Sequence, residues 1–273
     1  MAIRISIIGA AGRMGKALTR GLVDGWVPGL KLAGAVDLAG VPGQGTDAGL
    51  LAGAGAAGVA LTADLPALKP VTDVFIDFSF HTGIPERARL LPAWGIPWVI
   101  GTTGLTIAEK DAVREAAATL PVILAPNMSL GVNLLEALVE EAARRLAGKG
   151  YDIEIIETHH RKKLDAPSGT ALFLGEAAAR GAGVKLMDVA RNGREGMSKT
   201  VRPPQEIGFH AVRGGDIAGD HHVQFLAEGE MLDLSHRATT RDTFASGALR
   251  AAAWLHGKPA GLYSMRDVLG LEG

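Results

Sequence analysis

The chain has 273 residues, of which 47% are hydrophobic and 21% are charged, and its formal net charge is −1. This length suits one large domain or two ordinary ones, and the balanced charge lacks the basic surplus of nucleic-acid-binding proteins. Cysteine is absent, which excludes disulfides, thiolate zinc sites and cysteine nucleophiles. The short apolar start and the lack of about 18 consecutive strongly apolar residues predict a cytoplasmic protein without a membrane span.

The first elements predict a βαβ unit of the dinucleotide-binding kind. Residues 3–9 form a continuous β-branched run, as expected of a strand buried on both faces. A glycine loop then opens a helix that extends to residue 24, and a second strand over 30–37 ends in Asp37. Free N–H groups and the dipole at a helix start favour a pyrophosphate, and Asp37 can accept hydrogen bonds from ribose hydroxyls.

The glycine spacing departs from the strict dinucleotide pattern. Glycines at 9, 12 and 15 give G-x-x-G-x-x-G, with Ala11 where the second glycine usually allows close approach to the pyrophosphate. Alanine is still small enough for that place. Strand, loop, helix, strand and terminal acid in this order indicate a dinucleotide site more strongly than the glycines alone.

Strands and helices continue to alternate up to residue 129. A strand is expected over 72–79, and a strand with its following turn over 97–104 and over 121–129, with helices over 84–95 and 106–119 between them. This alternation predicts a Rossmann-type α/β fold with a doubly wound parallel sheet. Small polar turns, "DFSFH", "GTTG" and "APNMS", follow these strands. Each could be an ordinary turn or helix N-cap, but three at equivalent strand ends favour a shared ligand.

The alternation of strands and helices stops in the second half. After an amphipathic helix over 129–148, residues 207–240 predict three strands separated by "RGGD" and "AEGE", hence an α+β domain with an antiparallel or mixed sheet. A last helix over 241–258 returns to the first domain. We therefore expect a dinucleotide-binding domain of residues 1–130 and 240–273, and a substrate-binding and oligomerisation domain of residues 131–239.

Histidine spacing gives no support for a metal site. His221 and His222 are adjacent on an expected strand, so their side chains point to opposite faces. No H-x-x-x-H or H-x-H spacing occurs, and no catalytic metal is expected.

The segment "HHRKKLDAPSGT" (159–170) is the most unusual part of the chain. It lies between an alternating strand over 151–158 and a helix over 171–181, so it is a loop. A solvated basic loop is the plain interpretation. However, the Ser168-Gly169-Thr170 turn begins a helix whose N–H groups make a second anion site. With Arg161, Lys162 and Lys163, it predicts a small ligand that carries carboxylates. Ser168 lacks the G-x-S-x-G context of a nucleophile.

Several motifs in order along the whole chain resemble one family, the 4-hydroxy-tetrahydrodipicolinate reductases, also called dihydrodipicolinate reductases. They are "GAAGRMG" (9–15), "VIGTTG" (99–104), "APNMSLGVN" (125–133), "EIIETHHRKKLDAPSGTA" (154–171) and "RDVL" near the end. The resemblance implies an NADH- or NADPH-dependent oxidoreductase that reduces a cyclic, imine-containing dicarboxylate on the diaminopimelate route to lysine. It also implies a homotetramer built through the second domain's sheet.

The resemblance assigns roles residue by residue. His159 would be the general acid, a task that suits a group titrating near neutrality, and Lys163 a second proton donor or carboxylate clamp. His160, Ser168, Gly169 and Thr170 would bind substrate carboxylate. The cofactor would be lined by Gly9, Ala10, Ala11, Gly12, Arg13, Met14, Asp37, Gly101, Thr102, Thr103, Ala125, Pro126, Asn127 and Met128.

Cofactor choice and two alternative functions stay open. Leu38 follows Asp37 where the family often has an arginine that can meet a 2′-phosphate, which favours NADH, although Arg13 and Lys16 could serve NADPH. Another two-domain oxidoreductase, such as a sugar or semialdehyde dehydrogenase, would lack the 159–170 motif. A non-catalytic NAD-binding regulator would leave the His-Lys-anion cluster without a use.

Overall fold

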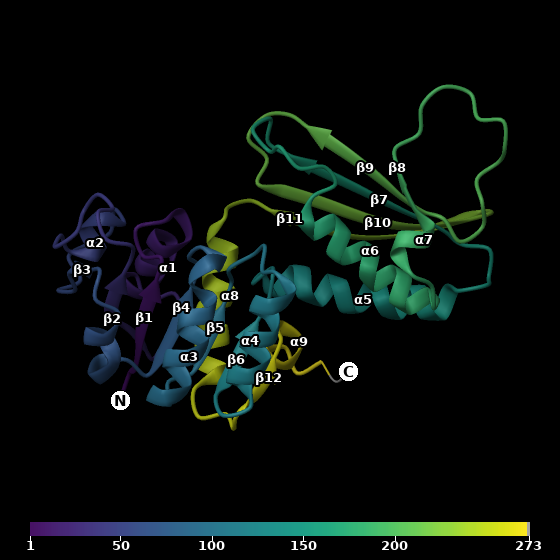
Figure 1. The fold of residues 1–273 in the computed structure, drawn as a ribbon. Helices are drawn as coiled ribbons and strands as arrows, with labels where there is room; N and C mark the ends of the chain where they lie inside the picture. Colours follow the sequence, from purple (N-terminus) through teal and green to yellow (C-terminus); the bar gives the residue numbers. More distant parts are fainter. Residues whose placement is uncertain (272–273) are drawn as a thin grey trace. The chain divides into compact units, whose positions relative to one another are not determined.

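The structure, a computed structural model, describes residues 1–271 and divides the chain into two compact units (Figure 1). Unit 1 consists of Met1–Leu130 together with the segment from Asp242 onward, and unit 2 consists of Gly131–Arg241. The chain thus leaves the first unit once and returns to it. Within residues 1–271, no helix has the length and apolar character needed to cross a membrane.

Unit 1 contains a seven-stranded sheet in which all paired strands are parallel. The spatial order is β12-β6-β5-β4-β1-β2-β3, which confirms the predicted Rossmann-type sheet. The order reverses between β1 and β4, and ligands of such sheets bind beyond the carboxyl ends of the strands at this point. The strands are β1 (Ile3–Ile8), β2 (Leu30–Val36), β3 (Leu61–Thr62), β4 (Val74–Asp77), β5 (Trp98–Ile100), β6 (Pro121–Leu124) and β12 (Gly261–Tyr263).

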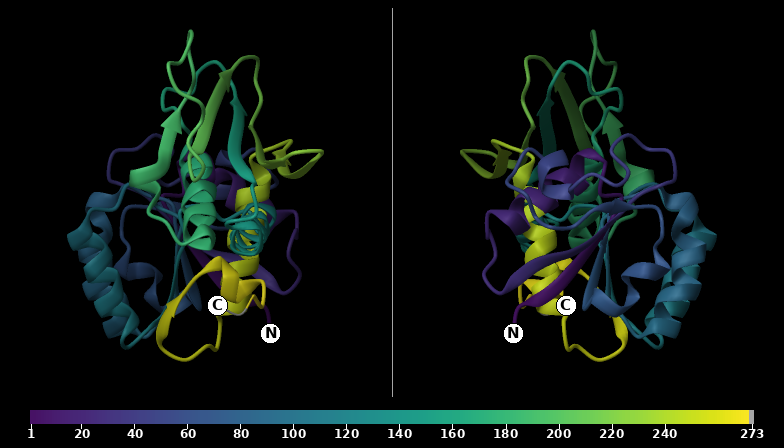
Figure 2. Two further views of the ribbon diagram at one scale, coloured as in Figure 1. Left: turned by 90° about the vertical axis from the view of Figure 1, so that its right-hand side faces the viewer. Right: turned by 90° about the vertical axis from the view of Figure 1, so that its left-hand side faces the viewer.

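Helices cover both faces of this sheet, with α3 and α4 along one face and α8 along the other (Figure 2). On β4, Val74 and Ile76 pack towards α1 and α8, whereas Phe75 packs towards α3 and α4. Burial on both sides explains why these strands are continuous apolar runs in the sequence. The helices are α1 (Arg13–Val23), α2 (Ala48–Leu51), α3 (Ile84–Trp94), α4 (Ile107–Ala117), α8 (Asp242–Leu255) and α9 (Met265–Val268), with short 3₁₀ turns η1 (Pro66–Val71) and η2 (His81–Gly83).

Unit 2 contains a five-stranded mixed sheet in the order β11-β10-β7-β9-β8. The strands are β7 (Asp152–His159), β8 (Ala190–Asn192), β9 (Ile207–Arg213), β10 (Gly219–Ala227) and β11 (Glu230–Ala238). The central strand β7 pairs parallel with β9 and antiparallel with β10. The "RGGD" turn therefore connects β9 and β10, which lie on either side of β7 and do not form a hairpin. The residues of the turn do not reveal which strands pair.

Two long helices pack on one face of the unit 2 sheet (Figure 1). They are α5 (Leu130–Leu146) and α6 (Gly169–Ala182), and a short helix α7 (Leu186–Val189) follows. The sequence places the end of α6 at Gly181, but Gly183 is its left-handed C-cap. Gly181 instead allows close packing on α5, because a Cβ there would lie 2.2 Å from the Glu140 carbonyl oxygen.

Candidate active site

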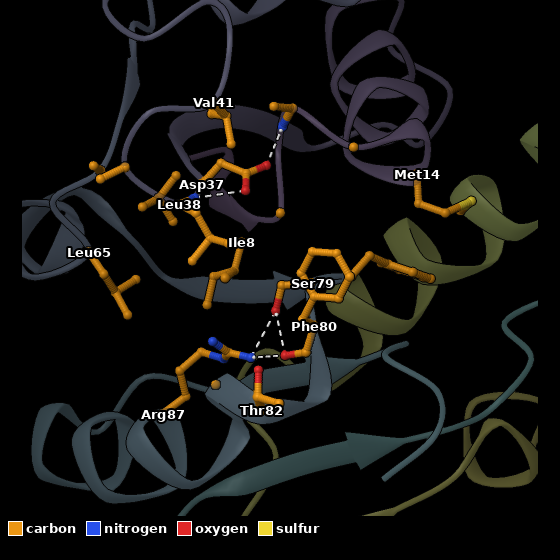
Figure 3. A pocket seen from close by; sticks show the side chains of 18 of the residues that line it. Ile8, Met14, Asp37, Leu38, Val41, Leu65, Ser79, Phe80, Thr82 and Arg87 are labelled. Carbon is orange, nitrogen blue, oxygen red and sulfur yellow. Dashed lines mark hydrogen bonds between the residues drawn. The ribbon is translucent and has the colours of Figure 1, made fainter.

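A cavity of about 910 Å³ lies at the carboxyl ends of β1, β2 and β4 in unit 1 (Figure 3). Its size is in the range of about 300–1,000 Å³ that is typical of small-molecule sites. Leu38, Val41 and Leu65 form an apolar wall on one side, and Ser79, Phe80 and Thr82 come from the segment after β4. The cavity thus lies where the strand order reverses, as expected of a dinucleotide site.

The glycine loop has the tight backbone that such a site requires. Gly9 has φ of +84°, and a Cβ on Gly15 would lie only 2.2 Å from the Gly9 carbonyl oxygen, so α1 packs closely on the loop. Gly12 is the N-cap of α1 and has no side chain to occupy the first-turn N–H groups. These N–H groups and the helix dipole fit a pyrophosphate.

Asp37 holds the loop as well as facing the cavity. Its carboxylate accepts hydrogen bonds of 2.8 Å from the N–H of Ala11 and from the N–H of Leu38 (Figure 3). An acceptor-only group at the end of β2 fits the ribose hydroxyls of a dinucleotide and opposes a phosphate on that ribose.

A buried ion pair orders the segment after β4. Arg87 Nε lies 2.6 Å from Asp77 Oδ2, close enough for an ion pair although the alignment is not that of a hydrogen bond. Arg87 also donates to the Ser79 hydroxyl at 2.8 Å and to the Phe80 carbonyl at 3.1 Å (Figure 3). Arg87 was not predicted from the sequence, because it is 72 positions or more from every glycine of the pattern and only the fold brings helix α3 to the cavity.

The predicted cofactor residues fall into two groups. Those that line the cavity are Gly9, Ala11, Gly12, Arg13, Met14 and Asp37. The others lie outside it: Ala10, Ala125 and Met128 are buried in the core, and Gly101 is packed so tightly that a Cβ would lie 2.2 Å from the Phe78 ring. Thr102 donates to the Asp77 carbonyl, Thr103 and Pro126 are exposed, and the Asn127 side chain accepts from the Ser129 N–H.

In unit 2, the motif around residue 159 is organised by a carboxylate that the sequence analysis did not select. Glu157, on β7, is 1% exposed. It accepts hydrogen bonds from His159 Nδ1 at 2.6 Å, from the Ser168 N–H at 3.0 Å and from both terminal nitrogens of Arg213 at 2.7 Å. The alternation in "EIIETHH" puts Glu157 on the same core-facing side of the strand as Ile155 and His159. Glu157 could have been found from the sequence, because a carboxylate on the apolar face of a strand requires hydrogen-bonding or charged partners.

Burial and charge set the ionisation of this cluster. Burial raises the pKa of Glu157, but the hydrogen bonds from Arg213 and His159 outweigh it and the pKa lies below its ordinary value. Burial lowers the pKa of His159, and the positive charges of Lys163 and Arg213 lower it further. The hydrogen bond and the charge of Glu157 raise it, but the pKa remains below its ordinary value. Burial also lowers the pKa of His221, whose ring meets that of His159 edge-on at 5.1 Å, to about 4.

Lys163, His160 and Ser168, also predicted from the sequence, each contact another side chain of unit 2. Lys163 forms an ion pair of 3.0 Å with Asp165. A terminal nitrogen of Arg241 donates a hydrogen bond of 3.0 Å to His160 Nε2. Ser168 is the N-cap of α6: its hydroxyl accepts from the Ala171 N–H and lies 3.2 Å from His221 Nε2. Gly169 and Thr170 form the first turn of α6, and Arg161 and Lys162 are exposed.

Similarity to known proteins covers nearly the whole chain. The family model described as the N-terminus of dihydrodipicolinate reductase matches residues 3–128, and the model of its C-terminus matches residues 131–269. The chain belongs to the dihydrodipicolinate reductase family. Two relatives named 4-hydroxy-tetrahydrodipicolinate reductase, from Anaeromyxobacter dehalogenans and Halorhodospira halophila, are 50% and 49% identical to it; the alignments cover 99% of this chain and 98% and 100% of theirs.

Solved structures agree with this membership. A dihydrodipicolinate reductase from a Paenisporosarcina species, bound to dipicolinate, has a TM-score of 0.74 at 25% identity over 97% of this chain and 98% of its own. A probable dehydrogenase from Thermotoga maritima has a TM-score of 0.62 at 12% identity over 98% of this chain and 93% of its own, which shows the fold alone. The predicted family, the Rossmann-type fold with a mixed second sheet, and the class of NAD(P)H-dependent oxidoreductase are thereby confirmed.

Proposed function

We propose that the chain reduces 4-hydroxy-tetrahydrodipicolinate with NADH or NADPH, in the diaminopimelate route of lysine biosynthesis. Family membership over both units supports the reaction, and the cluster of Glu157, His159 and Arg213 beside the Ser168 turn is the observation that carries it. NADH or NADPH supplies the hydride, and the cavity of unit 1 with its glycine loop and Asp37 fits such a dinucleotide.

The residues of unit 2 would bind the substrate and provide a proton. We assign the general acid to His159, which is positioned by Glu157, and the carboxylate clamp or second proton donor to Lys163. The N–H groups of Gly169 and Thr170, in the first turn of α6, would hold a carboxylate at the positive end of the helix. Ser168 contributes by fixing this turn, since its own N–H is bound to Glu157. His160 would contact the same carboxylate with Arg241 behind it.

The direct test uses purified protein, NADH or NADPH and enzymatically generated hydroxy-tetrahydrodipicolinate. We expect loss of the absorbance of the reduced nicotinamide, dependent on the substrate, and competitive inhibition by pyridine-2,6-dicarboxylate, the molecule bound in the Paenisporosarcina relative. Turnover of a sugar or a semialdehyde instead would assign another oxidoreductase activity. Tight cofactor binding without turnover of any substrate would indicate a regulator. Either outcome contradicts the proposal.

We further propose that the protein is a cytoplasmic homotetramer whose subunits meet through the unit 2 sheet. The face of this sheet opposite α5 and α6 carries Val212 and Met231, which are 49% and 57% exposed. Burial of these side chains against a second copy would be favourable. Sedimentation of the protein should give the mass of four chains, and Met231→Glu should reduce it; a single-chain mass for the native protein would contradict this proposal.

A further inference from the structure

The buried carboxylate of Glu157 ties together three separate segments of unit 2. It bonds His159 on its own strand, the Ser168 N–H at the start of α6, and Arg213 at the end of β9. Arg213 in turn donates to the Asp165 carbonyl in the 159–170 loop at 2.6 Å. The same carboxylate therefore fixes the proposed acid and the proposed carboxylate-binding turn.

These contacts determine which nitrogen of His159 can react. Glu157 is ionised, because three groups donate to it and its pKa is below the ordinary value. An ionised carboxylate only accepts, so Nδ1 of His159 must carry the hydrogen. Nε2 is then the nitrogen through which His159 can exchange a proton with a ligand.

A glycine leaves space beside this nitrogen. A Cβ on Gly219, at the start of β10, would lie 3.1 Å from His159 Nε2 and 3.4 Å from His221 Cε1. Gly219 does not have a positive φ, so its backbone conformation does not require glycine. Because Gly219 has no side chain, the Nε2 edge of the His159 ring stays unobstructed on this side.

We propose that Glu157 is a positioning residue for the reaction, holding Nδ1–H of His159 so that Nε2, beside Gly219, delivers the proton to the substrate. In this step the Nε2–H bond breaks and a C–H bond forms at the carbanion-like carbon left by hydride addition, and the imidazolium becomes a neutral imidazole. The inference rests on the proposed function and adds which atom acts and which carboxylate supports it.

The charged groups around His159 determine in which direction the loss of Glu157 would shift its pKa. Glu157 favours the protonated ring, whereas the charges of Lys163 and Arg213 oppose it. The adjacent His221, whose pKa is lowered to about 4, is neutral in this range. A general acid works only while protonated, so kcat/KM of the free enzyme falls as pH rises through the pKa of His159. Without the charge of Glu157 that pKa is lower, and the fall must occur at lower pH.

The first experiment compares the pH profiles of kcat/KM for the native enzyme and Glu157→Gln, with NADH saturating. We expect the descending limb to move to lower pH by about 1–3 units, the effect of an adjacent opposite charge, with the loss of kcat/KM largely recovered on the acid side. Glu154→Gln is the matched control, because Glu154 is a buried, arginine-bound carboxylate of the same strand on its other face. Its limb should stay at the native pH.

If kcat/KM of Glu157→Gln falls at the same pH as that of the native enzyme, the inference is wrong, whatever the size of kcat/KM. A purely structural role would lower activity without moving the descending limb. The native enzyme would still reduce the substrate in that case, so the proposed function would stand. Absence of native turnover would instead refute the proposed function.

The second experiment does not depend on the folding of Glu157→Gln. Gly219→Ala should lower kcat/KM by about tenfold or more, a part of the 10²–10⁴ that a general acid contributes. Gly214→Ala is the control, because Gly214 is in the same unit, has no positive φ, and a Cβ there meets no atom within 4 Å. A smaller difference between the two variants contradicts the assignment of Nε2.

Discussion

The two candidate sites use different physical means. The unit 1 cavity is shaped mainly by backbone, with a glycine at φ of +84°, a helix start capped by glycine and apolar walls, and a buried Arg87–Asp77 ion pair beside them. The unit 2 site is shaped by charged side chains removed from water, with Glu157 at 1% exposure as its centre. Backbone geometry tolerates few residue types at each position, whereas a buried charge depends on partners that come from elsewhere in the fold.

This difference explains why mutations should act differently in the two units. A Cβ added in unit 1 should displace backbone and weaken cofactor binding together with stability. Loss of a charge in unit 2 should change proton transfer or the pH dependence of stability.

His159→Gln should lower kcat by roughly 10²–10⁴, the usual weight of a general acid. The affinity for NADH should change little, since His159 is not among the residues of the unit 1 cavity. Steady-state kinetics and a fluorescence titration with NADH measure the two effects. His222→Gln, on the neighbouring strand β10 where the ring contacts Asp233, serves as control. Retention of most turnover by His159→Gln would remove its assignment as the acid.

Glu154→Gln should destabilise unit 2 near neutral pH. Burial raises the pKa of Glu154, but Arg194, His210 and Arg202 outweigh this and lower it from 4.5 to about 2, worth roughly 3 kcal/mol at 1.36 kcal/mol per unit. A lowered folded-state pKa stabilises above the unfolded value, and this contribution is lost as pH falls from about 4.5 to about 2. Urea unfolding at several pH values should show the variant and native curves converging in acid. A constant difference would contradict the ionic origin.

Lys163→Ala should weaken binding of substrate and of pyridine-2,6-dicarboxylate by about 1.5–3 kcal/mol, the usual contribution of a hydrogen bond to a charged group. Lys162→Ala, an exposed neighbour in the same loop, should have a much smaller effect. Inhibition constants of the three proteins measure this difference. Equal inhibition of all three, or no inhibition of the native enzyme at millimolar concentration, would argue against the dicarboxylate pocket.

Gly15→Ala should destabilise unit 1 by about 1–3 kcal/mol, the cost of overpacking, because the new methyl group would lie 2.2 Å from the Gly9 carbonyl oxygen. The same displacement should reduce NADH affinity. Gly55→Ala, where a Cβ meets no atom within 4 Å, is the control. Thermal unfolding and cofactor titration check both effects, and unchanged stability would mean that the loop can shift without cost.

The smallest effect concerns cofactor choice. Asp37 lines the cavity and Leu38 follows it, so NADH should be used at least as well as NADPH. Arg13 and Lys16 also line the cavity and limit this preference. Values of kcat/KM for both cofactors at equal, moderate ionic strength test it, since salt screens the charges. A preference for NADPH above about tenfold, near 1.4 kcal/mol, would show that the two cations outweigh Asp37.

Elements with strong local patterns could be predicted from the sequence. Strands β1, β2 and β7 and helices α3 and α4 lie where apolar periodicity and terminal residues predict them. Short elements were not predicted: β8, β12, α7 and α9 have three or four residues, too few to show a period. The glycine loop and the cationic motif were found because each lies within one continuous segment, where the required residue types stand at fixed spacing.

The tertiary structure alone decided the contacts between distant segments. Glu157 meets Ser168 and Arg213, which are 11 and 56 positions away, and Arg87 reaches the cofactor cavity from helix α3. Strand β7 separates β9 from β10, although a tight turn joins them in sequence. Pairing across a sheet and burial of charge depend on the whole packed structure rather than on neighbours in the chain. For this reason the residues that support His159 became visible only in the fold.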